Sequence, residues 1–140
     1  MTATRLAAIA LLSTGLLSAC QDAGERSITT LAPGSAYTVP RIDGVPAPEG
    51  VTFGVGEDGR VFGAAPCNRF TGQLTQKGGV MTISGVAMTR MACTDTARSA
   101  AETRFNTALG LVTGARRSED RATIALTDAE GRERILLQPK

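Results

Sequence analysis

The chain has 140 residues, with 15 lysines and arginines against 13 acidic residues, one tyrosine, four phenylalanines and no histidine. This near balance of charge argues against a nucleic-acid-binding protein, which needs a clustered basic face. Without histidine the chain cannot form the Ser-His-Asp or Cys-His arrangements that activate a nucleophile, nor the usual structural zinc site. We therefore expect no catalytic residues, no metal and no cofactor.

The N-terminus has the layout of a secretory signal peptide. Arg5 precedes an apolar stretch over residues 6–17, which is too short to span a bilayer comfortably, and Ser18-Ala19 follow. A cysteine directly behind Leu-Ser-Ala resembles the bacterial lipoprotein signal, in which the thiol is acylated and the leader is cut before it. Residues 1–19 are accordingly expected to be cleaved and Cys20 to carry the lipid. The alternative is an ordinary signal peptide with a chance cysteine near its cleavage site.

Residues 20–35 are predicted to form the lipidated N-terminus and a flexible tether. They are small and polar, with only Ile28 and Leu31 to bury. The residue after the cysteine is Gln21, whereas in lipoproteins of enterobacterial type an aspartate there is the usual signal for inner-membrane retention. We therefore expect a lipid anchor in the outer membrane, facing the periplasm. One domain over residues 36–140 accounts for the rest of the chain.

The first strands are predicted from alternating apolar residues. The stretch 37–45 is interrupted by Pro40, which suits an edge strand and a loop because proline cannot donate to a central ladder. After it, a two-residue type I′ turn at Asp58-Gly59 would place Val55 opposite Phe62 on one apolar face.

A second hairpin and one helix follow. A turn at Gly78-Gly79 would place Leu74 opposite Ile83. Asp95 is a candidate N-cap for a helix over residues 96–109, which has apolar positions at helical spacing and is expected to lie on the sheet.

The C-terminal part is predicted to contain two strands, over residues 122–127 and 134–138, whose register stays open. Arg116-Arg117 are interpreted as part of a charged surface loop. The segment 54–59 matches Gly-x-Gly-x-x-Gly, but a strand follows it instead of the helix that a dinucleotide site requires, so we interpret it as a hairpin turn.

Cys67 and Cys93 are the thiols that remain once Cys20 is acylated. In an exported and oxidising setting a disulfide between them is the default expectation. Two free buried thiols, or a redox-active pair, are the alternatives that the sequence leaves open.

Three segments resemble a known family. Residues 62–72, 88–93 and 102–109 look like the META domain of HslJ-like bacterial lipoproteins, and the resemblance covers about residues 37–137. It implies a β-rich α+β fold in which a curved antiparallel sheet, close to a small barrel, packs against one α-helix. It also implies an envelope-associated role, linked to stress or antibiotic tolerance in some members, and no established catalytic residues.

Asn68, Arg69 and Arg90 are the candidate binding residues. The expected bridge would bring the two arginines into one neighbourhood, where paired guanidinium groups could bind a carboxylate, a phosphate or a lipid headgroup. The alternative is structural, with Asn68 in a left-handed turn and both arginines bound to backbone carbonyls or nearby acids.

Two functions are consistent with these features. The first is a non-enzymatic, membrane-anchored envelope lipoprotein that binds an unidentified envelope protein or stabilises an assembly. The second is a carrier of a lipid or another apolar small molecule in a slot between sheet and helix. A filled core would favour the first function and an apolar cavity the second, the residues concerned being Phe53, Phe62, Leu74, Ile83, Phe105 and Leu126.

Overall fold

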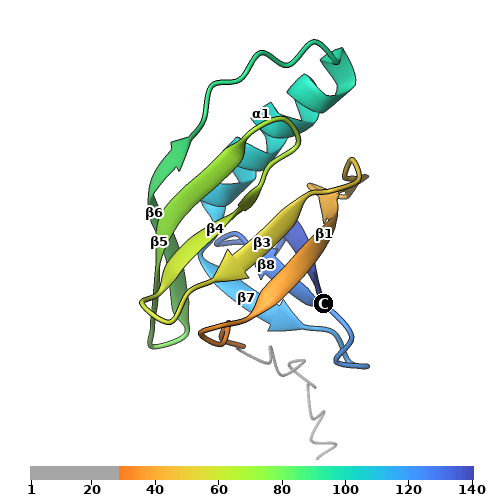
Figure 1. Ribbon diagram of the computed structural model, residues 1–140. Coiled ribbons are helices and arrows are strands. Elements are labelled where there is room, and N and C mark those ends of the chain that lie inside the picture. The colour runs from red at the N-terminus through yellow and green to blue at the C-terminus, as the bar shows by residue number, and fades with distance from the viewer. Residues whose placement is uncertain (1–28) are drawn as a thin grey trace, which may run out of the picture.

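The computed structural model describes residues 29–140 (Figure 1). Cys20, Ile28 and the predicted signal peptide lie outside the described residues. In chain order the elements are β1 (Ala36–Ile42), β2 (Val45–Pro46), β3 (Thr52–Val55), β4 (Arg60–Ala64), β5 (Arg69–Lys77), β6 (Val80–Met88), α1 (Thr96–Leu111), β7 (Gly114–Arg117), β8 (Ile124–Thr127) and β9 (Glu133–Pro139).

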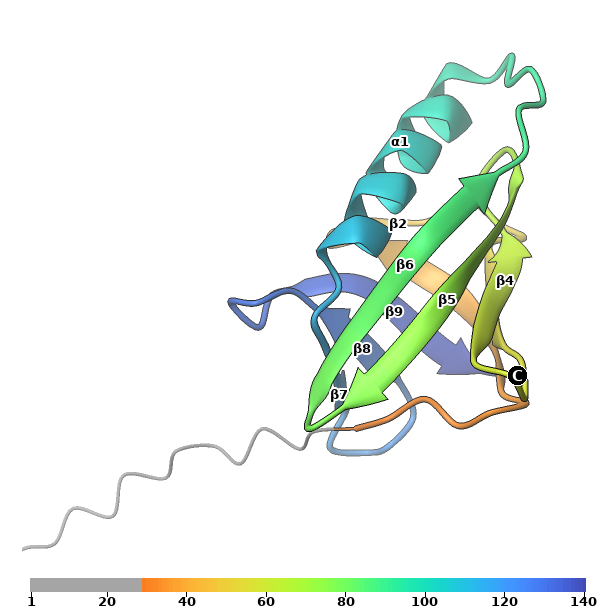
Figure 2. The same ribbon diagram turned by 90° about the vertical axis from the view of Figure 1, so that its left-hand side faces the viewer.

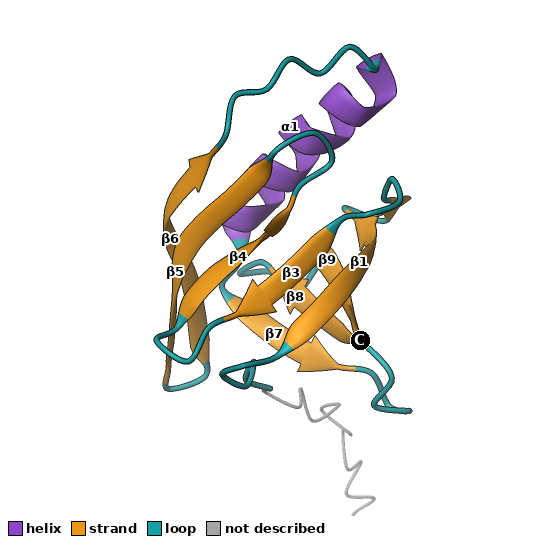
Figure 3. Ribbon diagram, viewed as in Figure 1, coloured by secondary structure: helices purple, strands orange, loops and turns teal. Residues whose placement is uncertain are grey.

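All the strands belong to one antiparallel sheet that curls into a half-barrel. Eight of them follow the order β6-β5-β4-β3-β1-β9-β8-β7, and β2 pairs with β1 off this path. The two ends of the sheet approach each other, since the Met81 amide donates to the Thr113 carbonyl at 2.9 Å. The helix α1 contacts β6, β1 and β9 and lies across the curled sheet (Figures 2 and 3). The predicted β-rich α+β fold with a curved antiparallel sheet and one helix is confirmed.

Three aromatic rings link the helix to the sheet inside the half-barrel. Phe70 of β5 lies 5.8 Å from Phe53 of β3 and 5.1 Å from Phe105 of α1, measured between ring centroids. All three side chains are buried. Tilted and edge-on aromatic pairs stabilise a fold beyond what the burial of their apolar area contributes. This cluster therefore fixes α1 against the sheet.

The β3–β4 hairpin differs by one residue from the predicted register. Val55 pairs with Val61 and Gly54 with Phe62. The loop has three residues, because the Gly56 amide donates to the Arg60 carbonyl and the Gly59 amide to the Gly56 carbonyl. This is the hairpin type in which a type I turn is followed by one left-handed residue, here Gly59 with φ +77°. Because a shift of one residue exchanges the two faces of a strand, Phe62 points outward and is 47% exposed.

The two-residue turn that was predicted at Asp58-Gly59 occurs instead at Asp43-Gly44, where φ is +49° and +74°. It joins β1 to the short β2, with Ile42 opposite Val45.

The prediction that the first strand is an edge strand is wrong, because β1 lies between β3 and β9. Pro40 is accommodated because the β1–β9 register shifts between Thr38 and Arg41, so its missing N–H falls at an irregularity in the ladder.

The β5–β6 hairpin and the start of the helix are confirmed. Leu74 pairs with Ile83, and both turn glycines, 78 and 79, have positive φ. The Asp95 carboxylate accepts from the amides of residues 97 and 98, as an N-cap does, and α1 continues through Gly110 to Leu111.

The C-terminal strands differ from the prediction at one place. Arg116 and Arg117, interpreted as part of a loop, lie in β7 and pair with Ala125 and Ile124 of β8. This strand is short, and its basic residues gave no sign of pairing in the sequence. The β8–β9 register, which the sequence left open, places Ile124 opposite Leu137.

The segment just before β1 is docked on the domain. Leu31 is 1% exposed, and its amide and carbonyl bond the side-chain amide of Gln76 at 2.7 and 2.9 Å. The Thr29 amide donates to the Ala115 carbonyl of β7. Residues 29–35 therefore belong to the folded domain and not to a free tether. Within residues 29–140 no helix combines the length and the apolar character needed to cross a bilayer.

Candidate functional site

Two loops meet at the end of the sheet nearest the start of α1, and we call them the apex. The apex consists of residues 65–68, between β4 and β5, and residues 89–95, between β6 and α1. A disulfide between Cys67 and Cys93 joins the loops, with 5.8 Å between the two Cα atoms. The predicted disulfide is confirmed, and it connects two of the three segments on which the family resemblance rests.

Asn68 holds the second apex loop from inside. Its side chain is buried, and its Oδ1 accepts from the Met91 amide at 2.7 Å and from the Thr89 hydroxyl at 3.0 Å. Its Nδ2 donates to Oε1 of Glu102. Asn68 does not adopt the left-handed conformation considered from the sequence, since the non-glycine residues with positive φ in the described chain are Asp43 and Arg121. Its role is to satisfy loop amides that would otherwise be unpaired.

Glu102 and Arg98 of α1 hold the first apex loop, and the sequence prediction missed both. Oε2 of Glu102 accepts from the amides of Cys67 and Asn68, at 2.8 and 2.7 Å. The Arg98 guanidinium donates through Nε to the Pro66 carbonyl at 2.8 Å. Both residues lie in the first two turns of the predicted helix, but they fall outside its apolar positions, and such charged residues usually face solvent.

Arg69 and Arg90 are brought into one neighbourhood by their backbones. The Arg69 amide donates to the Thr89 hydroxyl and the Thr89 amide donates to the Arg69 carbonyl, each at 3.0 Å. Both arginines are exposed, and in the described part of the chain neither forms an ion pair. Beside them Met91 is 67% exposed although its amide is bonded to Asn68.

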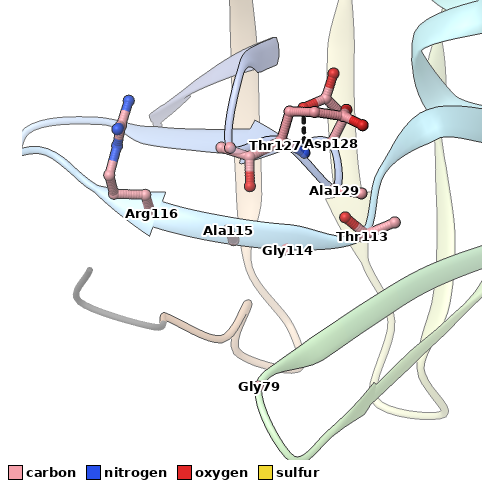
Figure 4. A pocket seen from close by; sticks show the side chains of 10 residues that line it. Gly79, Thr113, Gly114, Ala115, Arg116, Thr127, Asp128 and Ala129 are labelled. Carbon is pink, nitrogen blue, oxygen red and sulfur yellow. Dashed lines mark hydrogen bonds between the residues drawn. The ribbon is translucent and has the colours of Figure 1, made fainter.

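A hollow of about 280 Å³ lies away from the apex, between β7 and the β8–β9 turn (Figure 4). Its buried carboxylate, Asp128, closes that turn by accepting from the amides of Glu130 and Arg132 and from the Arg132 guanidinium. Burial raises the pKa of Asp128, but these hydrogen bonds and the nearby Arg132 charge outweigh it, so the pKa lies below its usual range. The Asp128 carboxylate is therefore engaged in closing the β8–β9 turn.

Ion pairs near this hollow also hold parts of the fold together. The pair between Arg134 and Asp43, 3.0 Å apart, joins β9 to the β1–β2 turn, and Arg41 lies 2.7 Å from Glu133. Among the residues that the structure describes, no group of three potential metal ligands converges.

The curled half-barrel, its single helix and the disulfide-linked apex define a small, β-rich α+β domain. The chain belongs to the META-domain family, whose model matches residues 29–140. The matched range includes the docked segment before β1.

Solved structures agree with this fold. The chain is similar to a Burkholderia xenovorans protein solved by NMR, with 19% identity, a TM-score of 0.60, and coverage of 77% of this chain and 83% of that one. A second NMR structure is similar at 22% identity and a TM-score of 0.58, covering 78% of this chain and 95% of the other. No curated protein matches significantly.

Proposed function

We propose that this META-domain protein is a non-enzymatic envelope lipoprotein, anchored through Cys20 and facing the periplasm from the outer membrane, whose apex binds a protein partner. The observation that carries the proposal is the exposure of the Met91 side chain on a fixed backbone. Its side chain is 67% exposed while its backbone is held by the buried Asn68. Methionine is a flexible apolar residue that is enriched at binding surfaces, and here it stands on a loop whose backbone is fixed.

The rigidity of the apex favours binding because less conformational entropy remains to be lost on association. The disulfide, Asn68 and Glu102 hold both loops before any partner arrives. Arg90 adds a cation next to Met91, which favours a partner surface with an acid beside an apolar pocket.

The position of the apex agrees with attachment at the N-terminus. Thr29, where the described chain begins, lies beside β7, whereas the loop 89–95 lies at the opposite end of the domain (Figures 1 and 2). A tether running from Cys20 to residue 29 would therefore leave the apex directed away from the attachment point.

The carrier function has less support. Five of the six residues named for the slot are buried in one continuous core, and the sixth, Phe62, faces outward. A core filled in this way leaves little room for an acyl chain between sheet and helix.

Anchoring is tested by mass spectrometry of the mature N-terminal peptide and by membrane fractionation. We expect an acylated Cys20 in the wild type and release of a Cys20→Ser variant from the outer-membrane fraction. An unmodified Cys20 in membranes, or unchanged fractionation of the variant, would contradict anchoring.

Partner binding is tested by cross-linking in the native envelope followed by affinity capture of the lipidated protein. We expect a defined partner that is lost in Met91→Ala and Arg90→Glu but retained in Leu111→Ala, which removes another exposed apolar side chain at the far end of α1. If all three variants capture the same proteins as the wild type, the apex is not the binding surface.

A further inference from the structure

The outer face of the sheet carries a groove beside the apex loops. It crosses β1, β3, β4 and β5 with a volume of about 360 Å³, and we call it the Phe62 groove. It continues into a second hollow of about 230 Å³ over β5 and β6, which shares Arg69 and Thr71 with it and reaches Thr89 of the apex. The two hollows together form an elongated depression across the strands. The residues that the argument uses are Gly54, Phe62, Arg69 and Thr71.

Phe62 forms a raised aromatic wall in this groove because its cross-strand neighbours are small. The register places Gly54 of β3 on one side and Thr71 of β5 on the other, with Ala87 of β6 beyond. A Cβ at position 54 would lie 2.9 Å from ring carbons of Phe62, so only glycine lets the ring rest over β3. The ring is thus supported by the sheet and is still 47% exposed.

Arg69 is the charged side chain on the strands that line the Phe62 groove. No acidic side chain lines the groove, and within residues 29–140 Arg69 forms no ion pair. An apolar surface beside an unpaired guanidinium group is complementary to an apolar group with a carboxylate beside it.

We propose that the Phe62 groove binds an extended acidic peptide segment of a partner protein, with an apolar side chain against Phe62 and a carboxylate on Arg69. The inference deepens the binding role proposed above but depends on Phe62 and Arg69 instead of Met91 and Arg90, so each set of contacts can fail without the other. A membrane is the less suitable occupant, because this face has a concave groove and one large exposed apolar residue, whereas membrane insertion requires several protruding ones.

The test is an NMR titration of the folded domain with a synthetic six-residue peptide that carries one leucine between two glutamates. We expect saturable shifts of amides around Phe62 and Thr71 at peptide concentrations up to about 1 mM. Phe62→Ala is expected to weaken binding about tenfold. Arg69→Glu changes an exposed side chain of the groove and is expected to weaken binding several-fold, and added salt should weaken it as well.

Two controls make the result decisive. Val80→Ala removes an exposed apolar side chain outside the groove and should bind as the wild type does. A peptide with lysines in place of the glutamates should not bind. Equal binding of both peptides, no shifts at the groove, or binding only to phosphatidylglycerol vesicles would overturn the proposal. Loss of partner capture in apex variants with the groove titration unchanged would locate binding at both surfaces.

Discussion

At the scale of single residues, Asn68 and Glu102 show how polar side chains replace secondary structure. The apex loops lack a regular ladder, yet the amides of Cys67, Asn68 and Met91 are all bonded by these two side chains. Loss of either partner would leave part-buried amides unsatisfied, which costs more than the hydrogen bond itself contributes.

We expect Asn68→Ala to lower the free energy of unfolding by about 1–3 kcal/mol, because it leaves the Met91 amide and a Glu102 oxygen without their partners. Chemical denaturation measures the change. Asn106→Ala, an exposed position on α1, is the matched control and should change stability little. Equal effects of the two substitutions would contradict the assigned role of Asn68.

The pKa of Asp128 gives the domain an acid-sensitive turn. Because its pKa is lowered in the folded state, its contribution to stability is complete above the ordinary carboxyl value of about 3.9 and is lost as pH falls through the lower folded value. Asp128→Asn should be less stable than the wild type at neutral pH, and the difference should shrink toward low pH. Thermal unfolding between neutral and acidic pH measures it, and a difference independent of pH would refute the linkage.

At the scale of elements, turn chemistry decided which strands pair and in what register. The chain has Asp-Gly at 43–44 and at 58–59, and only the first pair forms a two-residue turn with both residues at positive φ. At the second pair, Gly59 alone is left-handed, the loop gains a residue, and Phe62 moves to the outer face. The same dipeptide thus gives two hairpin types.

Removal of the disulfide should loosen the junction between the sheet and α1. We expect the double variant Cys67→Ser and Cys93→Ser to lose about 3–4 kcal/mol, according to the loop-closure model for a cross-link of this span. The redox alternative makes a separate prediction of thiol–disulfide turnover with a small dithiol. We expect none, and measured turnover that requires Cys67 would revive that alternative.

At the scale of the whole molecule, the segment before β1 bridges the half-barrel near the seam between its two ends. Thr29 bonds β7, Leu31 bonds Gln76 of β5, and the Gly34 amide donates to the Val55 carbonyl of β3. Strands that are distant along the sheet are therefore joined by one short stretch of chain.

Leu31→Ala should destabilise the whole domain although it precedes the first strand. Its side chain is 1% exposed within the core, so we expect a loss of about 2–5 kcal/mol. The neighbouring Thr30→Ala, at an exposed position, should have little effect. Calorimetry compares the two, and an unaffected melting temperature for Leu31→Ala would show that the segment is dispensable.

The features that could be predicted from the sequence rest on local rules. Gly78-Gly79 determines the β5–β6 register, Asp95 caps α1, and the cysteine count leads to the disulfide, because each depends on residues close in the chain or on simple pairing. The family resemblance supplied barrel curvature, which periodicity alone does not contain.

Other features were decided only by tertiary structure, because they depend on contacts between distant segments. Pairing with β9, about a hundred residues away, makes β1 an interior strand despite Pro40. Leu31 is buried because its side chain covers part of the core of the curled sheet while Gln76 bonds its backbone. The sequence by itself determined the β5–β6 hairpin, the start of the helix and the disulfide. Folding decided which faces the elements bury, and so placed Met91 and Phe62 on the surface and Asn68 beneath it.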